Sequence, residues 1–372
     1  MRLAAKFRLA RAVVLGCAIM ACADFRAGRA QEAERARLDS IRLDSLARDS
    51  VARLDSIARA DSIALADSLA RVDSVRRADS LRTARAARAA RAAASPTRSS
   101  RATDSVPWPA LPPVLPGAVV PGSRVVAYYG NPLSRRMGVL GEYPRDEMIR
   151  RLEATVAEWA EADSTTPVRP ALHMIVTVAQ ADAGRDGMYR LRMTDSVINR
   201  VAQWAEQRGW LFFVDVQIGL STVEAELPRL VSFLERPYVH LALDPEFAMK
   251  DGTRPGRKIG TMDAAEINHA IRFLADIVER NKLPPKMLVV HRFTERMLTN
   301  ADQIVADPRV QVIIDMDGFG APQLKRSTWR HVIQNDPVQY AGFKLFYKND
   351  KPMLTPRQVI DLFPSPVYIQ YQ

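Results

Sequence analysis

The sequence predicts a (β/α)8 barrel, a TIM barrel, over residues 119–372. Eight short runs rich in apolar, β-branched and aromatic residues follow one another there, and segments with the spacing of amphipathic helices separate most of them. Such alternation implies parallel pairing of the strands. The region is close to the length of about 250 residues that is typical of these barrels. No GxGxxG sequence follows the first run, as it would in a doubly wound dinucleotide-binding sheet.

The eight predicted strands are 124–129, 172–178, 211–218, 239–243, 287–291, 310–316, 342–347 and 367–372. The predicted helices are 148–162, 196–207, 223–234, 264–280, 295–305 and 325–333. Helix starts are indicated by a capping-box pattern from Ser221 to Glu224, a related pair at Asp263 and Glu266, and Thr355-Pro356. Because the sequence reaches Gln372 on the last strand, we expect a barrel without a final helix, with part of 107–122 covering the gap.

Most of the positive charge precedes this domain. Residues 1–117 hold 21 Lys and Arg against 12 Asp and Glu, a formal +9 of the chain's +11. The remainder is nearly neutral and lacks the gathered basic surface of a nucleic-acid-binding domain, so we expect no nucleic-acid partner. Both cysteines, Cys17 and Cys22, also precede the domain, which excludes a disulfide, a thiolate nucleophile or a cysteine metal ligand within it.

Residues 1–22 predict an export signal. A basic start is followed by the apolar run 12–21, which is too short to span a bilayer. The sequence Ile19-Met20-Ala21-Cys22 resembles a bacterial lipobox, which implies lipidation of Cys22 and a membrane anchor. Ala23 after the cysteine implies an outer-membrane lipoprotein that faces the periplasm or the surface. The alternative is an ordinary signal peptide cut after Ala30, which gives a secreted protein.

Residues 23–106 predict a low-complexity spacer, and 107–118 a proline-rich linker. Asp-Ser followed by an aliphatic residue repeats every five or six residues from Asp39 to Leu81. Arginine follows several of these aspartates by four positions, which favours a solvated helix, and a disordered spacer is the alternative. Six residues advance a helix by about 240°, so the aliphatic residues form no coiled-coil stripe. We therefore expect a monomer.

Polar residues gather at the C-terminal ends of six predicted strands, where barrel enzymes place their active sites. Strand residues two apart share a face, so four pairs are expected to lie on common faces and to converge: Asp215 and Gln217, Asp244 and Glu246, Asp315 and Asp317, and Gln370 and Gln372. The expected substrate-binding set is Tyr128 or Tyr129, Thr177, Asp215, Gln217, His291, Arg292, Lys344, Gln370 and Gln372. Buried carboxylates are costly unless paired, so this convergence implies a cation, basic partners or a polar ligand.

Asp244-Pro245-Glu246, at the end of the fourth predicted strand, is the sharpest local motif. It resembles the Asp-x-Glu motif of barrel glycoside hydrolases, particularly Chalaropsis-type lysozymes. The resemblance implies Glu246 as general acid and Asp244 as its modulator, while Asp315 or Asp317 could supply the second carboxylate. Residues 119–372 also resemble an uncharacterised group of exported bacterial barrel proteins that share the Tyr-Gly start, the Asp-Pro-Glu and a Gln-rich last strand.

These features favour a glycoside-hydrolase-like enzyme of the cell envelope or the extracellular space, whose partner is a glycan or cell-wall polymer. A tethered glycan-binding protein without turnover is one alternative. The other is a hydrolase that uses a divalent cation held by oxygen ligands and His291. We expect no zinc site, because the sequence has no HxH, HExxH or cysteine set, and no cofactor apart from that possible divalent cation. Phosphodiesterase chemistry, which would use two histidines, is not favoured, because only His291 is well placed and His173 is expected to begin its strand.

Overall fold

The computed structural model describes residues 108–372. The predicted signal peptide 1–22 with Cys22, the spacer 23–106 and the first residue of the linker lie outside the described residues. Among the described residues, no helix has both the length and the apolar character needed to cross a membrane.

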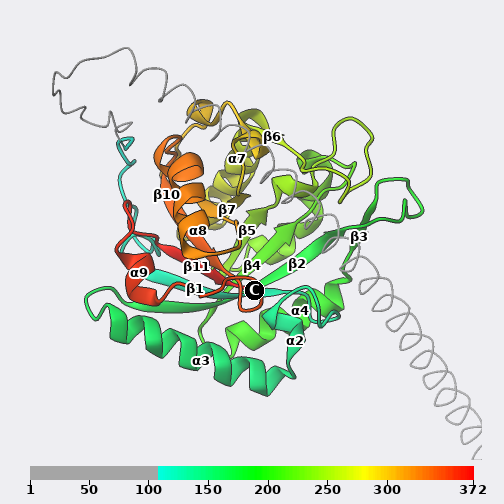
Figure 1. Ribbon diagram of the computed structural model, residues 1–372. Helices are drawn as coiled ribbons and strands as arrows, with labels where there is room; N and C mark the ends of the chain where they lie inside the picture. The colour runs from blue at the N-terminus through cyan, green and yellow to red at the C-terminus, as the bar shows by residue number, and fades with distance from the viewer. Residues whose placement is uncertain (1–107) are drawn as a thin grey trace, which may run out of the picture. The chain divides into compact units, whose positions relative to one another are not determined.

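Eight parallel strands close into the predicted barrel (Figure 1). They are β1 (Arg124–Gly130), β2 (Val168–Ala179), β4 (Leu211–Val216), β5 (Val239–Leu243), β7 (Lys286–Arg292), β9 (Val310–Met316), β10 (Tyr340–Leu345) and β11 (Tyr368–Tyr371). Each pairs with the next in this order, and β1 pairs with both β2 and β11, which closes the ring. A short strand, β3 (Arg190–Arg192), extends the end of β2 in an antiparallel hairpin.

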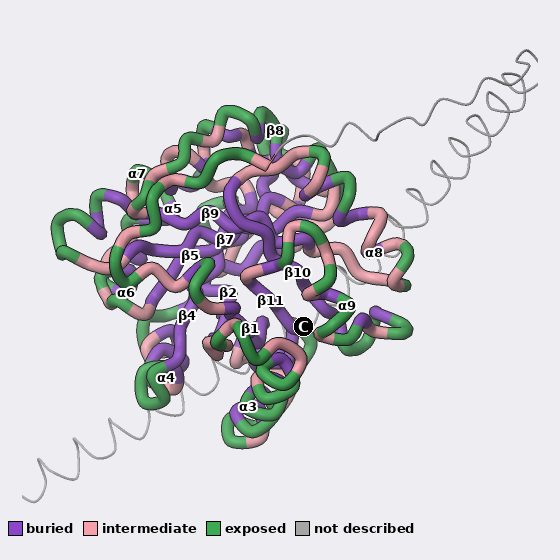
Figure 2. The backbone as a smooth tube through the Cα atoms, turned by 90° about the vertical axis from the view of Figure 1, so that its left-hand side faces the viewer, coloured by how far each residue is buried: buried purple, intermediate pink, exposed green. Residues whose placement is uncertain are grey.

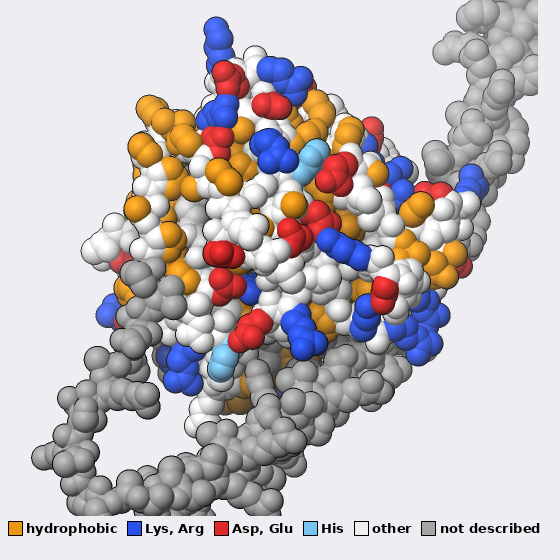
Figure 3. Space-filling model, turned by 90° about the horizontal axis from the view of Figure 1, so that it is seen from above, with side chains coloured by type: hydrophobic (Ala, Val, Ile, Leu, Met, Phe, Trp, Pro, Cys, Tyr) orange, Lys and Arg blue, Asp and Glu red, His pale blue; other side chains and the backbone are white. Residues whose placement is uncertain are grey.

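Helices and loops surround this barrel. The helices are α2 (Val139–Glu142), α3 (Arg145–Ala162), α4 (Asp195–Glu206), α5 (Val223–Glu226), α6 (Val231–Leu234), α7 (Ala264–Asn281), α8 (Pro322–Trp329) and α9 (Pro356–Ile360). Figure 2 shows buried strands inside a ring of elements whose outer faces are exposed. The apolar stripes of α3, α4 and α7 supply most of the helical side of the core, as their periodicity predicts. On the face shown in Figure 3, Lys and Arg side chains are interspersed with Asp and Glu.

Two predicted helices differ in the structure. The segment predicted as helix 295–305 contains two 3-10 turns and the short strand β8 (Leu298–Thr299), which pairs with β6 (Met262–Asp263). The segment 223–234 is divided into α5, a 3-10 turn and α6 around Pro228. Proline lacks the amide proton of a continuous helix, so the interruption follows from the sequence.

Of the three predicted helix starts, the Asp263 box with Glu266 and the Thr355 box are present. The third predicted start, the box from Ser221 to Glu224, was placed one residue too early. Thr222, and not Ser221, accepts the backbone N–H of Ala225, while the Ser221 hydroxyl donates to Glu226.

The proline-rich segment closes the N-terminal end of the barrel. Val120 is fully buried among the apolar residues that fill the barrel interior, and its backbone exchanges hydrogen bonds with the Gln311 side chain. Beside β11, Trp159 of α3 donates a hydrogen bond of 2.9 Å to the Tyr371 hydroxyl. Apolar side chains fill the N-terminal end of the barrel interior. The polar part of the interior therefore lies towards the C-terminal ends of the strands.

Candidate functional site

The strand register brings inward-facing polar side chains from distant parts of the sequence together. Asp215 of β4 lies opposite Ile175 of β2, His291 of β7 lies opposite Asp315 of β9, and Lys344 of β10 lies opposite Gln370 of β11. We call the resulting group the polar cluster: His173, Asp215, Asp244, His291, Asp315, Asp317, Lys344 and Gln370, all of them nine-tenths or more buried at the side chain.

His291 is the centre of this cluster. Its Nε2 lies 3.4 Å from Oδ2 of Asp215. Its Nδ1 lies 3.1 Å from Oδ2 of Asp317 and 3.4 Å from Oδ2 of Asp315. The imidazole therefore joins three carboxylates from the ends of two strands, β4 and β9, that are far apart in the sequence.

His173 lies on the other side of Asp215, with its Nε2 3.4 Å from the same Oδ2. Its Nδ1 is 2.6 Å from the Tyr368 hydroxyl and 3.0 Å from the side-chain nitrogen of Gln370. The ring stacks on Phe213, at a centroid distance of 5.4 Å and an interplanar angle of 8°. The stacking on Phe213 and the contacts at Nδ1 thus fix the orientation of the ring, and Nε2 is directed at Asp215.

Lys344 supplies the positive charge of the C-terminal rim. Its Nζ is 3.0 Å from Oδ2 of Asp317 and 3.9 Å from the centroid of the Tyr129 ring, an ion pair combined with a cation–π contact. Burial raises the pKa of the Tyr129 phenol, and the charges of Asp215, Asp244, Asp317 and Glu246 raise it further. The charges of carboxyl groups at the ends of both β5 and β9 therefore influence Tyr129.

The Asp-Pro-Glu motif forms a turn and does not continue the strand. β5 ends at Leu243, and Pro245–Phe247 is a 3-10 turn capped by Asp244, whose Oδ1 accepts the backbone N–H of Glu246 at 3.1 Å. Oδ2 of Asp244 accepts a hydrogen bond of 3.1 Å from Gln217. The expectation that Asp244 and Glu246 share a strand face is therefore wrong, because strand alternation ends before the motif begins. Asp244 is buried and Glu246 is partly exposed.

The carboxyl groups of the cluster differ in acidity. Burial raises the pKa of Asp244 to about 7, and repulsion from Asp215 and Asp317 adds to this while His291 and Lys344 oppose it. Burial also raises the pKa of Asp315. For Asp317, burial alone would raise the pKa, but Lys344 and His291 together hold it below its usual range. The cluster thus contains a carboxyl group that titrates near neutrality and another that stays ionised.

The two histidines are perturbed in opposite directions. Burial lowers the pKa of His173 to about 4, although Asp215 opposes the effect. Burial would also lower the pKa of His291, but the carboxylates of Asp215, Asp315 and Asp317 outweigh it and raise the pKa well above the usual value. For Asp215, the two histidines outweigh the effect of burial and lower the pKa.

Several residues of the predicted set lie elsewhere. The Tyr128 hydroxyl contacts Thr155 of α3 at 2.8 Å and Tyr347 at 3.0 Å, outside the barrel interior, so Tyr129 is the member of that pair in the site. Arg292 donates to backbone carbonyls of neighbouring loops and forms an ion pair of 2.7 Å with Asp336. The buried Thr177 hydroxyl has no hydrogen-bond partner among the described residues. The backbone of Gln372 pairs with that of Leu345 and Tyr347.

The sequence reasoning missed His173, Tyr368 and Gly342 as parts of the site. β2 begins at Val168, four residues before the predicted start, so His173 lies in the middle of its strand, level with Tyr129. A Cβ at Gly342 would lie 2.8 Å from Oδ1 of Asp315, so the absence of a side chain makes room for that carboxylate. The alternation of Ala171, His173 and Ile175 was the signal that could have placed the histidine inside the barrel.

Buried polar atoms without a hydrogen-bond partner concentrate here. Among the described residues they include Nε2 of His173, both carboxylate oxygens of Asp215 and Asp315, both ring nitrogens of His291 and Oε1 of Gln370. The ligand atoms of His173, Asp215 and His291 lie within 4.8 Å of one another, close enough to hold one metal ion. The arrangement therefore offers carboxyl groups for acid–base chemistry at the rim and a possible coordination set below it.

Comparison of the sequence with models of known protein families and with curated proteins finds no match.

Proposed function

We propose that this protein is an exported glycoside-hydrolase-like enzyme that cleaves a polysaccharide or peptidoglycan by carboxylate acid–base catalysis. One observation carries the proposal: the ends of β5 and β9 bring carboxyl groups to the same end of the barrel, Glu246 on the turn capped by Asp244, and Asp317 in an ion pair with Lys344. Glycoside hydrolysis requires such a pair, one group to protonate the leaving oxygen and one to stabilise or attack the sugar.

Glu246 is the proposed general acid. It lies on a turn whose backbone is fixed on both sides, since its N–H is bound by Asp244 and its carbonyl oxygen accepts from Gly260 at 2.6 Å. Its side chain is partly exposed, so a substrate oxygen can reach it. The neighbouring Asp244, with a pKa of about 7, changes the local charge near neutral pH and thereby modulates the acid.

Asp317 is the better candidate for the second carboxylate. Asp315 is fully buried at the side chain, whereas Asp317 is 9% exposed and forms the ion pair with Lys344. A carboxylate held beside an ammonium group and an imidazole remains charged, as a base, a nucleophile or a stabiliser of an oxocarbenium-like transition state must. The same Lys344 ammonium lies 3.9 Å from the centroid of the buried Tyr129 ring, which helps to hold it beside Asp317.

The test is hydrolysis of a panel of polysaccharides and peptidoglycan by the full chain, measured as released reducing ends, with Glu246→Gln, Asp317→Asn and the control Glu235→Gln. Glu235 is an exposed glutamate outside the cluster. We expect Glu246→Gln to lower the rate by roughly 10²-fold or more, because general acid catalysis contributes about that much. Glu235→Gln should match the wild type.

Two results would overturn the proposal. One is hydrolysis that Glu246→Gln leaves unchanged. The other is saturable glycan binding that persists in Glu246→Gln without product from any substrate, which would identify a tethered glycan-binding protein.

A further inference from the structure

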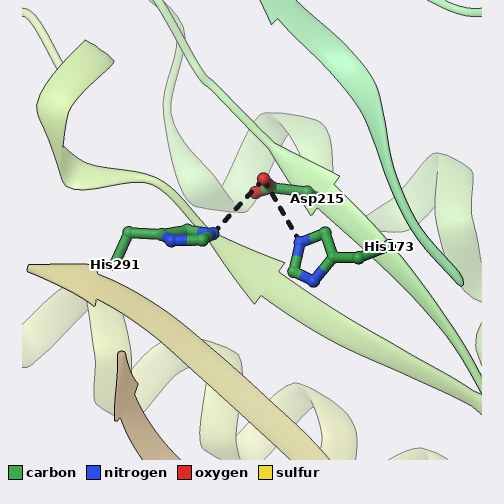
Figure 4. Close-up of side chains that lie close together, drawn as sticks. All are labelled: His173, Asp215 and His291. Carbon is green, nitrogen blue, oxygen red and sulfur yellow. Dashed lines mark ion pairs between the residues drawn. The ribbon is translucent and has the colours of Figure 1, made fainter. Parts of the chain in front are cut away.

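A compact group of His173, Asp215 and His291 lies in the polar cluster, and the proposed hydrolysis uses only one of them, the His291 ring beside Asp317 (Figure 4). The three side chains come from β2, β4 and β7, and each is fully buried. Both histidines direct Nε2 at the same carboxylate oxygen of Asp215, as the close-up shows. Two imidazoles that converge on one carboxylate are an unusual arrangement for a barrel interior, and they are a common one around a metal ion.

The distances match coordination better than hydrogen bonding. Each Nε2 lies 3.4 Å from Oδ2 of Asp215, whereas a charge-assisted N–H···O bond is about 2.7–2.9 Å long. Ligand atoms about 2.1 Å from a tetrahedral ion lie roughly 3.4 Å from one another. The two contacts therefore have the length of edges of a coordination tetrahedron.

The opposite nitrogen of each ring is held by an outer partner. Nδ1 of His291 lies 3.1 Å from Asp317, and Nδ1 of His173 lies 2.6 Å from the Tyr368 hydroxyl. The side-chain nitrogen of Gln370 donates to Nδ1 of His173, so this nitrogen is an acceptor, while the carboxylate of Asp317 favours a proton on Nδ1 of His291. A metal ion at Nε2 of either ring would take the place of a proton there, so metal binding would release protons.

The three side chains also have unsatisfied polar atoms. Nε2 of His173, Nε2 of His291 and both oxygens of Asp215 have no hydrogen-bond partner among the described residues. Each Nε2 faces the buried carboxylate at 3.4 Å, so a positive charge is needed between the rings and Asp215, and a metal cation can supply it. A bound cation would satisfy all three side chains at once.

We propose that His173, Asp215 and His291 bind a divalent transition-metal ion of the Zn²⁺, Fe²⁺ or Co²⁺ class. Two imidazole ligands favour these ions over Ca²⁺ and Mg²⁺, which prefer oxygen donors. Three protein ligands leave one coordination position for a further ligand. The proposed glycan hydrolysis uses Glu246 and Asp317 as its carboxyl groups, so the two proposals share the contact between Asp317 and His291 but assign no residue both roles.

The experiment measures metal binding to the full chain after treatment with a chelator. Zn²⁺ binding is followed by calorimetry, and Co²⁺ binding by its visible absorption, which reports coordination geometry. The variants are Asp215→Asn, His173→Gln and Tyr368→Phe, with His331→Gln as control, because His331 is an exposed histidine whose ring contacts the Ser327 carbonyl. Circular dichroism checks that each variant is folded.

We expect one Zn²⁺ or Co²⁺ per chain in the wild type and in His331→Gln. Affinity should fall by roughly 100-fold or more when a ligand is replaced, and by about 10- to 100-fold in Tyr368→Phe, where only the outer partner is removed. Because Tyr368→Phe keeps all three ligands, it tests the proposal even if a ligand variant does not fold. Absence of binding to the folded wild type, or equal affinity in wild type, Asp215→Asn and Tyr368→Phe, would overturn it. Glycan hydrolysis by the metal-free protein would leave the two proposals separate.

Discussion

Lys286, at the start of β7, should make the stability of this barrel depend on alkaline pH. Its side chain is fully buried, and its Nζ donates to the backbone oxygens of Arg236 at 2.6 Å and Val239 at 2.9 Å. Burial lowers its pKa from 10.5 to about 7. The buried His240 is the titratable neighbour, and burial together with the charge of Lys286 lowers its pKa well below the usual value.

The magnitude follows from proton linkage. A folded-state pKa of about 7 lies below the unfolded value of 10.5, so the unfolded chain binds more protons between these limits. The free energy of unfolding should therefore rise with pH across that window, by up to about 1.4 kcal/mol per pH unit and roughly 5 kcal/mol in total. Below pH 7 the lysine is charged in both states, and the full cost of burial is present.

The variant Lys286→Met removes this cost together with two hydrogen bonds of about 1 kcal/mol each. We expect Lys286→Met to be more stable than the wild type by about 3 kcal/mol at pH 6.5, and less stable by about 1 kcal/mol near pH 10, where the unfolded lysine is still partly protonated. Urea denaturation at pH 6.5, 8 and 9.5 measures the difference, and Lys351→Met, at an exposed lysine, controls for loss of charge. A difference between Lys286→Met and wild type that is constant from pH 6.5 to 9.5 would refute the reasoning.

Three further predictions concern the turn, a buried ion pair and the helix that covers β11. Gly260→Ala should lower stability by about 2 kcal/mol and displace the Glu246 turn, because the new Cβ would lie 2.6 Å from the Pro245 carbonyl oxygen. The control is Gly122→Ala, whose Cβ would have only the Val119 carbonyl oxygen near it, at 3.8 Å, and which should leave the thermal melt unchanged. Glu226→Gln should cost about 3 kcal/mol at pH 7, because the buried carboxylate accepts from Arg190, Arg192 and Ser221. These partners lower the pKa of Glu226 against the effect of burial, so the stabilisation should be lost as the pH falls below 4.5. Urea denaturation of wild type and Glu226→Gln at pH 7 and below pH 4.5 measures this, and a stability difference that is the same at both pH values would contradict it. Tyr371→Phe leaves the buried Trp159 N–H without its acceptor and should cost about 1–3 kcal/mol in urea denaturation, and an unchanged midpoint would contradict this.

The barrel could be predicted from the sequence because each element carries its own periodicity. Between Arg124 and Gln372, apolar residues recur with the period of a strand or of a helix, because each element buries one side. The structure has the corresponding strands in the expected order. The same alternation placed Asp215, Asp315 and Lys344 on the inner face. The segment 295–305 shows the limit of this reasoning, because its apolar spacing suits a helix although it forms two turns and a short strand.

The composition of the site was decided by the tertiary structure. His291 contacts Asp215 and Asp317 because the pairing of β7 with its neighbours places these side chains at the same level along the barrel axis. His173 contacts Asp215 because β2 begins at Val168, which places His173 inside the strand. The end of β5 at Leu243 likewise turned the Asp-Pro-Glu motif from two strand positions into a capped turn. By itself the sequence determined which side chains face inward, since that depends on the alternation within one strand. The distances between them depend on the pairing of strands far apart in the chain, which no local pattern encodes.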